Sequence, residues 1–541
     1  MPITVRDTLE VKMPQSPSAA FTLGPDFNVH DLPSQIGTGY SILEAETEQR
    51  DEEYLDTFDW RLLASGRALA RSQRRYRLYS TNGDIICQDR GPAKLRPFCW
   101  DFSDGPLRDE LKAAADIRAL CPQVQMQQQR QHYNLLNADE KIVLRLRRDT
   151  MTAVFPGKEP EQFSSLHLYG IRGYSRPLQT VSRIIGQSGG LPVAEGEIFL
   201  VPALKAAGIS PEKMRAKFAV SLQPDITVFE GLKDVGQALL ADISMHQPGV
   251  IEDIDSEYLH DFRIALRRTR SLLSLYSRIL PISACDYFRN EFKWITQTTN
   301  TVRDCDVYLL MTEEYQAMLP ARLHPGLISY FEGLRTLRKK EFKLMRRRLK
   351  SQRAARLFSD WQAFLQEELQ LLQEPKGKTS CRLFAAKMLK KRYKRILAKG
   401  SECGPESPDT MLHALRIQAK KLRYLLEFFR SLFSVDDVDQ LIKHLKKLQN
   451  NLGEFNDLSV QQTMLGSFQS PVKTDSVERM LRVAAALGGL ITHLADRQAL
   501  VRGEFEENFL QFAGKDVQGL VKTIIGDSEH VSREDEDPPA A

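Results

Sequence analysis

Two segments in the second half of this chain repeat each other at nearly the same distance along the sequence. The stretch HDFRIALRRTRSLL at 260–273 recurs as HALRIQAKKLRYLL at 413–426, which lies 153 residues later. The stretch NTVRDCDVYL at 300–309 is echoed 151 residues later by NLGEFNDLSV at 451–460. Two matches at almost one offset indicate a tandem duplication, and the period exceeds that of open solenoid arrays. We therefore predict two related halves, over about 235–375 and 380–520.

Composition and hydrophobic periodicity divide the chain into two domains and a tail. Residues 1–222 mix short apolar runs with Gly and Pro, and IVLRLRRD (142–149) and SSLHLYGI (164–171) alternate as β-strands do. Residues 232–520 show helical periodicity almost throughout. The polar, acidic stretch 521–541 is predicted to be a disordered tail. The expected fold is an N-terminal α+β domain followed by an all-α helical bundle of two pseudo-symmetric halves.

Charge is distributed unevenly between these parts. Residues 241–520 hold 44 Lys and Arg against 34 Asp and Glu, whereas residues 1–240 hold 29 against 30. A basic domain implies an anionic partner, such as nucleic acid, acidic lipid or another polyanion. No apolar run reaches the roughly 18 residues that a membrane helix needs, and the N-terminus does not resemble a secretory signal. Seven scattered cysteines without a CxxC pair complete the prediction of a reduced, cytoplasmic protein without membrane contact.

The two copies of the first motif carry the same cationic face. At about 100° per residue, one His and three cations of each copy fall within an arc of about 80° on a helix. These residues are His260, Arg263, Arg267 and Arg270 in the first copy, and His413, Arg416, Lys420 and Arg423 in the second. Arg268 and Lys421 lie at the rim of the two faces. Two copies of one cationic face predict an anion site to which both halves contribute.

Two further segments add cations. Residues 335–356 contain eleven Lys and Arg and one acidic residue, and residues 382–399 contain eight Lys and Arg and no acidic residue. Their predicted binding faces consist of Lys339, Lys343, Arg346 and Lys350 in the first segment and Lys387, Lys390, Lys391 and Lys394 in the second. One basic face is most often a solvated surface. Four such faces, two of them related by duplication, favour a polyanion that relieves their mutual repulsion.

Several of these residues have alternative roles. His260 and His413 could cap a helix or hold a protein hydrogen bond instead of contacting a ligand. Asp306 and Asp457 correspond to each other at the second offset. We interpret both aspartates as structural partners of nearby basic groups, and the alternative is that they anchor a divalent ion accompanying a phosphate chain.

The duplicated motifs resemble the CHAD family, the conserved-histidine α-helical domain. The resemblance covers about 235–515 and is carried by HDFRIALRRTRSLL, NTVRDCDVYL, HALRIQAKKLRYLLEFF and LKKLQNNLGEFNDL. It implies a compact bundle of two pseudo-symmetric helical halves around a basic channel that binds inorganic polyphosphate. It also makes the His, Arg and Lys residues of the two motifs the expected channel residues, and an association with polyphosphate granules would follow.

The N-terminal domain resembles the CYTH, or triphosphate tunnel, family in YLDTFDWRLLASGRALAR (54–71) and RQHYNLLNADEKIVLRL (130–146). The resemblance implies an antiparallel β tunnel in which glutamates hold a divalent metal such as Mg²⁺ or Mn²⁺. The chain departs from this pattern where acidic residues are expected, at Thr8, Arg145, Arg147, His167 and Tyr169. A divergent CYTH-like tunnel, used for binding or as a scaffold, is therefore expected. Five cations could still hold an anion there: Arg61, Arg67, Arg71, Arg74 and Lys217.

The leading interpretation is a polyphosphate-binding protein that requires no cofactor. The alternative is a metal-dependent triphosphatase or polyphosphatase that uses the CYTH-like domain, where Glu10 and Lys12 remain from the tunnel motif. The missing carboxylates argue against catalysis without excluding it, and phosphate release with Mg²⁺ or Mn²⁺ would decide. Nucleic-acid binding is disfavoured, because the basic helices lack interleaved aromatic residues and no reading motif is present. The sequence does not predict the oligomeric state.

Overall fold

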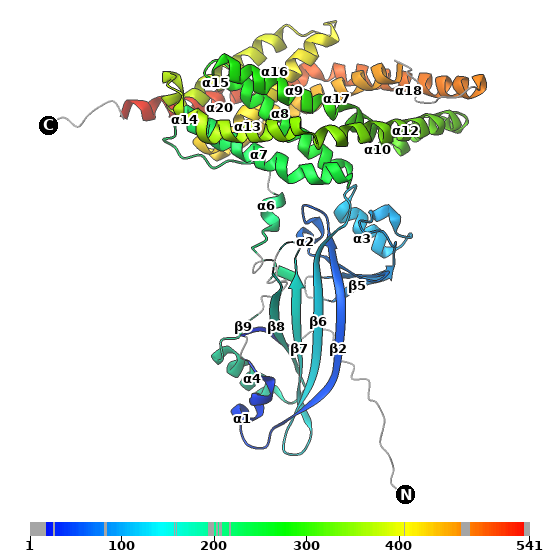
Figure 1. The fold of residues 1–541 in the computed structure, drawn as a ribbon, viewed down its shortest axis with the longest axis vertical. Coiled ribbons are helices and arrows are strands. Elements are labelled where there is room, and N and C mark those ends of the chain that lie inside the picture. The colour runs from blue at the N-terminus through cyan, green and yellow to red at the C-terminus, as the bar shows by residue number, and fades with distance from the viewer. Residues whose placement is uncertain are drawn as a thin grey trace, which may run out of the picture. The chain divides into compact units, whose positions relative to one another are not determined.

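The computed structural model describes residues 18–534, except 25–26, 81–83, 156, 158, 193–199, 202–203, 205–207, 216–217, 405 and 467–475. The chain divides into two compact units, Met1–Ala216 and Lys217–Ala541 (Figure 1). The opening segment with Thr8, Glu10 and Lys12 lies outside the described residues, and so does Lys217. Within the described ranges, no helix is both long and apolar enough to cross a membrane.

The first unit is built on an antiparallel sheet. Among the described residues it has nine strands in the order β5-β4-β3-β2-β6-β7-β8-β1-β9. The strands are β1 (Ala19–Leu23), β2 (Ser41–Asp56), β3 (Ala68–Ser72), β4 (Arg75–Tyr79), β5 (Ile85–Arg90), β6 (Cys121–Leu136), β7 (Ile142–Val154), β8 (Glu161–Gly170) and β9 (Leu191–Pro192). The two segments that alternate in the sequence lie in β7 and β8, and the prediction of a strand-rich N-terminal domain is confirmed.

Short helices accompany this sheet. They are η1 (Val29–Asp31), α1 (Leu32–Ile36), α2 (Arg61–Ala64), η2 (Cys99–Asp101), α3 (Pro106–Ala115), α4 (Ser175–Gln187) and α6 (Pro211–Arg215). Strand alternation sends Leu135, Leu144 and Leu166 to one core, where they meet Val181 and Ile185 of the amphipathic α4. The described strands run from β5 at one end of the order to β9 at the other, and closure into a tunnel stays a prediction.

The second unit is helical throughout. Its elements are α7 (Val228–Glu252), α8 (Ser256–Tyr276), α9 (Ile282–Thr298), α10 (Asn300–Leu310), α11 (Thr312–Ala317), η3 (Ala321–Leu323), α12 (His324–Leu349), α13 (Gln352–Ala363), η4 (Phe364–Glu368), α14 (Leu369–Leu371), η5 (Pro375–Lys378), α15 (Cys381–Ser401), α16 (Asp409–Phe428), η6 (Arg430–Leu432), α17 (Val435–Gly466), α18 (Val477–Gly503), α19 (Phe505–Ala513) and α20 (Lys515–Glu534). The predicted all-α second domain is confirmed.

The helices of this unit repeat in order along the chain. Helices α7, α8, α9, α12 and α13 begin at 228, 256, 282, 324 and 352, and α15, α16, α17, α18 and α19 begin at 381, 409, 435, 477 and 505. Every pair of starts is therefore 153 residues apart. Helices α9 and α10 together correspond to the single helix α17. Packing repeats as well, because α7 contacts α8 and α10 contacts α12, as α15 contacts α16 and α17 contacts α18.

The predicted end of the helical domain at residue 520 is wrong. Helix α20 continues through the first part of the acidic segment to Glu534. The reason is an apolar stripe that crosses the predicted boundary, since Val517, Val521, Ile524 and Ile525 are all buried. At about 100° per residue, these four residues fall within an arc of about 100° and share one face of a helix. Residues 535–541 lie outside the described part of the chain.

Candidate functional site

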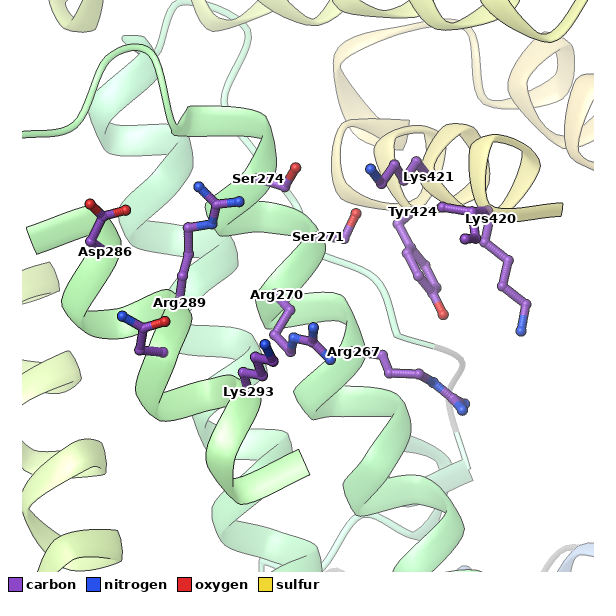
Figure 2. A pocket seen from close by; sticks show the side chains of 12 residues that line it. Arg267, Arg270, Ser271, Ser274, Asp286, Arg289, Lys293, Lys420, Lys421 and Tyr424 are labelled. Carbon is purple, nitrogen blue, oxygen red and sulfur yellow. The ribbon is translucent and has the colours of Figure 1, made fainter. Parts of the chain in front are cut away.

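A cleft opens between α8, α9 and α16 in the helical unit (Figure 2). Its volume is about 780 Å³. The lining residues are Arg267, Arg270, Ser271, Ser274, Asp286, Arg289, Asn290, Lys293, Ile417, Lys420, Lys421 and Tyr424. Six of these described residues are Lys or Arg, and one is a carboxylate. The cleft therefore concentrates positive charge from helices of both halves.

Four of the six cleft cations were predicted from the sequence. Arg267 and Arg270 lie on α8, and Lys420 and Lys421 lie on α16. The structure thus brings together the cationic faces of the two duplicated motifs at one cleft. Their helices are in contact with each other, as the shared anion site requires.

Two cleft cations on α9 were missed. Arg289 and Lys293 are four residues apart, a spacing that places both side chains on one helix face. The predicted cationic segments are dense basic runs, whereas here Glu291 lies between the two cations. In the structure Glu291 instead binds Arg353 of α13, with Nε 2.7 Å from the carboxylate Oε2. The i, i+4 pair would have been the signal for this third cationic face.

The electrostatics of the cleft show cations that are short of carboxylate partners. Burial, together with the nearby Arg416 and Arg267, lowers the pKa of Lys420 to about 8. Burial together with Arg289 also lowers the pKa of Arg270. The buried Nε of Arg267 has no hydrogen-bond partner in the described part of the chain. An anion in the cleft would stabilise the charged form of each group.

His260 and Arg263, near the start of α8, form hydrogen bonds within the protein. Arg303 of α10 donates from Nη2 to Nδ1 of His260 at 2.8 Å. Arg263 donates from Nη1 to Oγ1 of Thr299 at 2.5 Å and to Oδ1 of Asn300 at 2.8 Å. Burial lowers the pKa of Arg263 to about 10. These contacts tie α8 to the junction of α9 and α10, and neither residue lines the cleft.

The second half has a corresponding arrangement on α16 and α17. Nδ1 of His413 contacts Oδ1 of Asn456, and Nη2 of Arg416 donates to Oδ1 of Asp457 at 3.0 Å. His413 and Asn456 are 43 residues apart, as are His260 and its partner in the first half. Like their counterparts, His413 and Arg416 hold neighbouring helices together and are absent from the cleft lining.

These contacts correct the alignment of the second repeated motif. At the offset of 153 residues that the helix starts share, Asp457 corresponds to Asp304, not to Asp306. The partner of each histidine then occupies the same helical position in both halves. Asp306 is buried and binds Arg338, which also binds Asp253 at 2.6 Å. Its predicted role as a structural partner of a basic group is confirmed, and the same holds for Asp457.

Two predicted cations of the duplicated motifs point away from the cleft lining. Arg268 binds Glu427 at 2.9 Å, and its guanidinium carbon lies 4.8 Å from the ring centroid of Phe218. Arg423 binds the same carboxylate at 2.7 Å. Glu427 therefore neutralises both arginines and joins α8 to α16. The sequence pattern placed Arg423 with its counterpart Arg270, but the carboxylate one turn later draws it away.

The two additional basic segments do not line the cleft either. Lys339 and Lys343 line a separate shallow cavity on α12 with Thr336, Lys340, Leu344 and Arg347. Arg346 and Lys350 are exposed near the end of the same helix. On α15 the predicted lysines are exposed: Lys387, Lys390, Lys391 and Lys394. These surfaces remain outside the cleft in the described structure.

A different face of α15 approaches the cleft. Burial lowers the pKa of Lys421, and Arg392 and Arg395 of α15 contribute with Arg289. Burial lowers the pKa of Arg392 itself to about 10. The lysine-rich face of α15 that was predicted to bind is exposed to solvent. Of the two arginines near Lys421, Arg392 is half-buried and Arg395 is exposed. Periodicity alone does not say which basic face is turned inward.

In the first unit, the arginines proposed to hold an anion are engaged by protein oxygens. Their partners are Asp59 for Arg61 (2.9 Å), Glu110 for Arg67 (3.2 Å), Glu53 for Arg71, and the carbonyl oxygen of Gly91 for Arg74 (3.2 Å). Each guanidinium therefore already has a carboxylate or carbonyl acceptor. The described part of this unit supports a structural role for these four residues.

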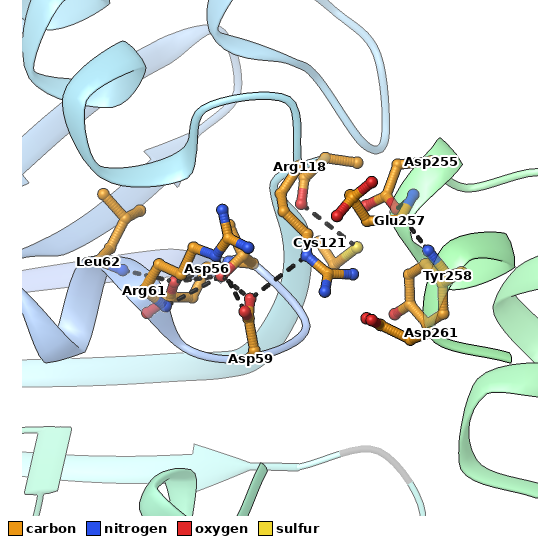
Figure 3. Close-up of polar contacts among 12 residues, drawn as sticks. Asp56, Asp59, Arg61, Leu62, Arg118, Cys121, Asp255, Glu257, Tyr258 and Asp261 are labelled. Atoms are coloured by element: carbon orange, nitrogen blue, oxygen red, sulfur yellow. Dashed lines mark hydrogen bonds and ion pairs between the residues drawn. The ribbon is translucent and has the colours of Figure 1, made fainter. Parts of the chain in front are cut away.

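A buried aspartate closes the turn that leads to α2 (Figure 3). Asp56 accepts hydrogen bonds from the backbone N–H groups of Thr57 at 2.7 Å and of Leu62 and Leu63 at 2.9 Å. Burial raises the pKa of Asp56 to about 7, against the opposing effect of these donors. Its neighbour Asp59 is held by the arginine of α2, so the carboxylates of this turn serve the local fold.

The sheet carries one carboxylate surrounded by basic groups. Asp149 on β7 lies 3.0 Å from Nε of Arg130 and 3.1 Å from Nη2 of Arg147. His167 lies 3.5 Å from the same carboxylate, and burial together with Arg147 lowers its pKa to about 4. Within the described residues, no group of three or more His, Cys, Asp or Glu side chains is placed to hold a metal ion.

Comparison with known proteins identifies part of the helical unit. The family model of the CHAD domain matches residues 235–466, a range that includes both copies of the duplicated motif. The CHAD domain from the plant Ricinus communis is similar, with 23% identity, 54% of this chain and 94% of that chain covered, and a TM-score of 0.45. PptA from Streptomyces chartreusis is 16% identical, with 52% and 99% covered and a TM-score of 0.40. A search of curated proteins finds no match. The helical unit of this chain contains a CHAD domain.

Proposed function

We propose that the cleft between α8, α9 and α16 binds inorganic polyphosphate. The observation that carries this proposal is the lining of six Lys and Arg side chains against one carboxylate among the described residues. Three of these cations have pKa values lowered by burial: Arg270, Lys420 and Lys421. Bound phosphates would offset the repulsion among the cations. The link between CHAD domains and polyphosphate in general agrees with this chemistry.

The packing of the halves supports one shared site. Helices α7, α8 and α12 each contact their counterparts α15, α16 and α18. This pattern is the one expected if the halves are related by a pseudo-two-fold axis near the α8–α16 contact. A polyphosphate chain in the cleft would then touch Arg267 of one half and Lys420 of the other at once.

The structure separates two kinds of residue within this proposal. The contacts to phosphate would come from the cleft cations Arg267, Arg270, Arg289, Lys293, Lys420 and Lys421. The residues His260, Arg263, His413 and Arg416 would position α8 and α16 through their protein contacts. The exposed lysines of α12 and α15 would contact only the parts of a long chain that extend beyond the cleft. Association with polyphosphate granules would follow from the same binding.

We propose no reaction for the first unit. Arg61, Arg67, Arg71 and Arg74 contact protein oxygens, and Asp149 is surrounded by cations. No described feature of this unit therefore favours a metal-dependent triphosphatase. A phosphate-release assay on the full chain with Mg²⁺ or Mn²⁺ tests this directly. Turnover near about 1 s⁻¹ or above, an ordinary enzymatic rate, would restore the enzymatic alternative.

The binding proposal is tested with the full chain and long-chain polyphosphate in a salt titration. Each phosphate neutralised by a cation releases counterions, so the logarithm of the binding constant should fall linearly with the logarithm of salt concentration; the relation is taken from nucleic acids. Absence of binding at low salt, or an affinity that does not change with salt, would contradict the proposal.

A further inference from the structure

The cleft is lined by more than cations. Ile417 and Tyr424 of α16 contribute an aliphatic and an aromatic side chain, and Ile417 is 39% exposed. Ser271 and Ser274 of α8 and Asn290 of α9 contribute neutral polar groups. An inorganic phosphate chain has no apolar part for the first pair to contact. The lining therefore fits a ligand that joins phosphates to an organic group.

Apolar and cationic side chains share one face of α16. At about 100° per residue, Ile417, Lys420, Lys421 and Tyr424 fall within an arc of about 100°. All four line the cleft. The aromatic residue is a feature of the second half alone, because its counterpart 153 residues earlier is Ser271. This also corrects the sequence-based expectation that no aromatic side chain accompanies the basic faces.

The ring of Tyr424 is supported from the protein side. It is half-buried, and it stacks on Phe428 with ring centroids 6.4 Å apart and an interplanar angle of 19°. Figure 2 shows the ring projecting from α16 into the cleft between Lys420 and Lys421, toward α8. A ring that is braced from behind and open toward a cavity can serve as a stacking platform.

The size of the cleft is also suitable for a small organic ligand. Its volume of about 780 Å³ lies within the usual range of small-molecule sites, about 300–1,000 Å³. Such a volume leaves room for a base and a ribose beside the phosphates. Ser271 and Asn290 would offer hydrogen-bonding groups to ribose hydroxyls or base edges.

We propose that the cleft binds nucleoside polyphosphates, with the phosphates on the cleft cations and the base stacked on Tyr424. This inference rests on the proposed function, because the same cations hold the phosphates in both cases. The ring adds an attraction that an inorganic chain lacks. Base–aromatic stacking is tolerant of base identity, so several nucleotides should bind.

The test compares ATP with tripolyphosphate on the full chain by isothermal titration calorimetry at one ionic strength. ATP should bind at least as tightly as tripolyphosphate, although its lower charge alone would make it weaker. Tyr424→Ala should weaken ATP binding by about 5- to 150-fold, the range of one base–aromatic stack. Tripolyphosphate binding should change less than about twofold. This retained tripolyphosphate affinity shows that the alanine variant is folded. Tyr424→Phe keeps the ring and should retain ATP binding.

Tyr424→Ser, which installs the residue of the equivalent position, should behave as the alanine variant does. Trp100→Ala removes an exposed aromatic side chain of the first unit and should leave both ligands unaffected. The inference is overturned if ATP binds more weakly than tripolyphosphate, or if Tyr424→Ala changes both affinities equally or neither. If long-chain polyphosphate binds and ATP does not, the proposed function stands and this inference fails. If no phosphate ligand binds, both fail.

Discussion

Equivalent positions in the two halves of the helical unit carry side chains of different chemistry. Arg267 of α8 corresponds to Lys420 of α16, and Ser271 corresponds to Tyr424. Arg267 carries a permanent charge, whereas burial lowers the pKa of Lys420 to about 8. The duplication therefore supplies a common framework of helices. Within it, the α8 positions carry an arginine and a serine, whereas the equivalent α16 positions carry a lysine of lowered pKa and a tyrosine.

A second difference between the halves lies outside the cleft. The part of α12 and α13 over residues 335–356 contains eleven Lys and Arg. The equivalent residues 488–509 contain two Lys or Arg and four Asp or Glu. A dense basic surface is thus present in the first half alone. A polyphosphate chain would contact this surface only with the part that extends beyond the shared cleft. The contributions of the cleft and of this surface to the affinity should therefore be separable by mutation.

The largest expected effect comes from reversing charge on either side of the cleft. Arg267→Glu with Arg270→Glu, and separately Lys420→Glu with Lys421→Glu, should each weaken long-chain polyphosphate binding by about 30-fold or more, as loss of buried charge pairing does. Titration calorimetry measures both.

The matched control is Lys387→Glu with Lys391→Glu on the exposed face of α15, which should change the affinity less than about threefold, as exposed ion pairs do. If one half tolerates its reversal while circular dichroism shows a folded protein, binding is confined to the other half and the shared cleft is wrong.

The titratable side of the cleft predicts a pH dependence. Below pH 7, Lys420 is already charged in the free protein, so this residue should not make the polyphosphate affinity depend on pH. Above the pKa of about 8, the free lysine loses its proton and binding must restore it. The affinity for polyphosphate should then fall by up to about tenfold per pH unit, the limit for uptake of one proton.

Lys420→Arg makes this position match Arg267 of the first half, so it should flatten the affinity profile between pH 7 and pH 9.5. Calorimetry in buffers of different ionisation enthalpy counts the proton taken up. An unchanged profile in the arginine variant would show that another group is responsible.

A smaller difference should appear in the positioning residues. Arg303 holds the histidine of α8 and also donates to the carbonyl oxygen of Ser256 at 3.2 Å, whereas Asn456 holds the histidine of α16 and a neighbouring aspartate. Arg303→Ala should lower the free energy of unfolding by about 1 kcal/mol more than Asn456→Ala, because a charged donor to two groups is lost. Urea denaturation measures both values. Equal losses would mean that the two histidine contacts are energetically equivalent despite their chemistry.

The smallest effect is expected on α12. Lys339→Ala with Lys343→Ala should reduce the salt dependence of long-chain binding by about two phosphate contacts and the affinity by about threefold. Tripolyphosphate is too short to extend from the cleft, so its affinity should not change. A comparable loss for tripolyphosphate would place the α12 lysines at the primary site.

The sequence predicted the helical unit well because the duplication leaves a periodic signal. The cationic faces at Arg267 and Lys420 were found since their helices are continuous and their neighbours apolar. Long-range contacts decided the rest. Arg423 binds Glu427 and does not line the cleft. Glu291 lies between the two cations of α9 in the sequence, but in the structure it binds Arg353.

The register of the second motif shows the same limit. Sequence similarity over such short segments does not distinguish an alignment offset of 151 residues from one of 153. The common spacing of the helix starts and the contacts of His260 and His413 fix which residues correspond. The boundary at residue 520 failed for a related reason, since acidic composition outweighed the apolar stripe that buries Val521 and Ile524. Composition describes a segment's average, and burial depends on which face each side chain occupies.

The most direct test of the shared cleft is lysine footprinting by mass spectrometry. The full chain would be acetylated with and without long-chain polyphosphate, and the modification rate of each lysine compared. Lys293, Lys420 and Lys421 should be protected together, because they line one cleft from both halves. Lys387 and Lys391, which are exposed on α15, should react at nearly unchanged rates. Protection of exposed lysines with no change at the three cleft lysines would contradict the account.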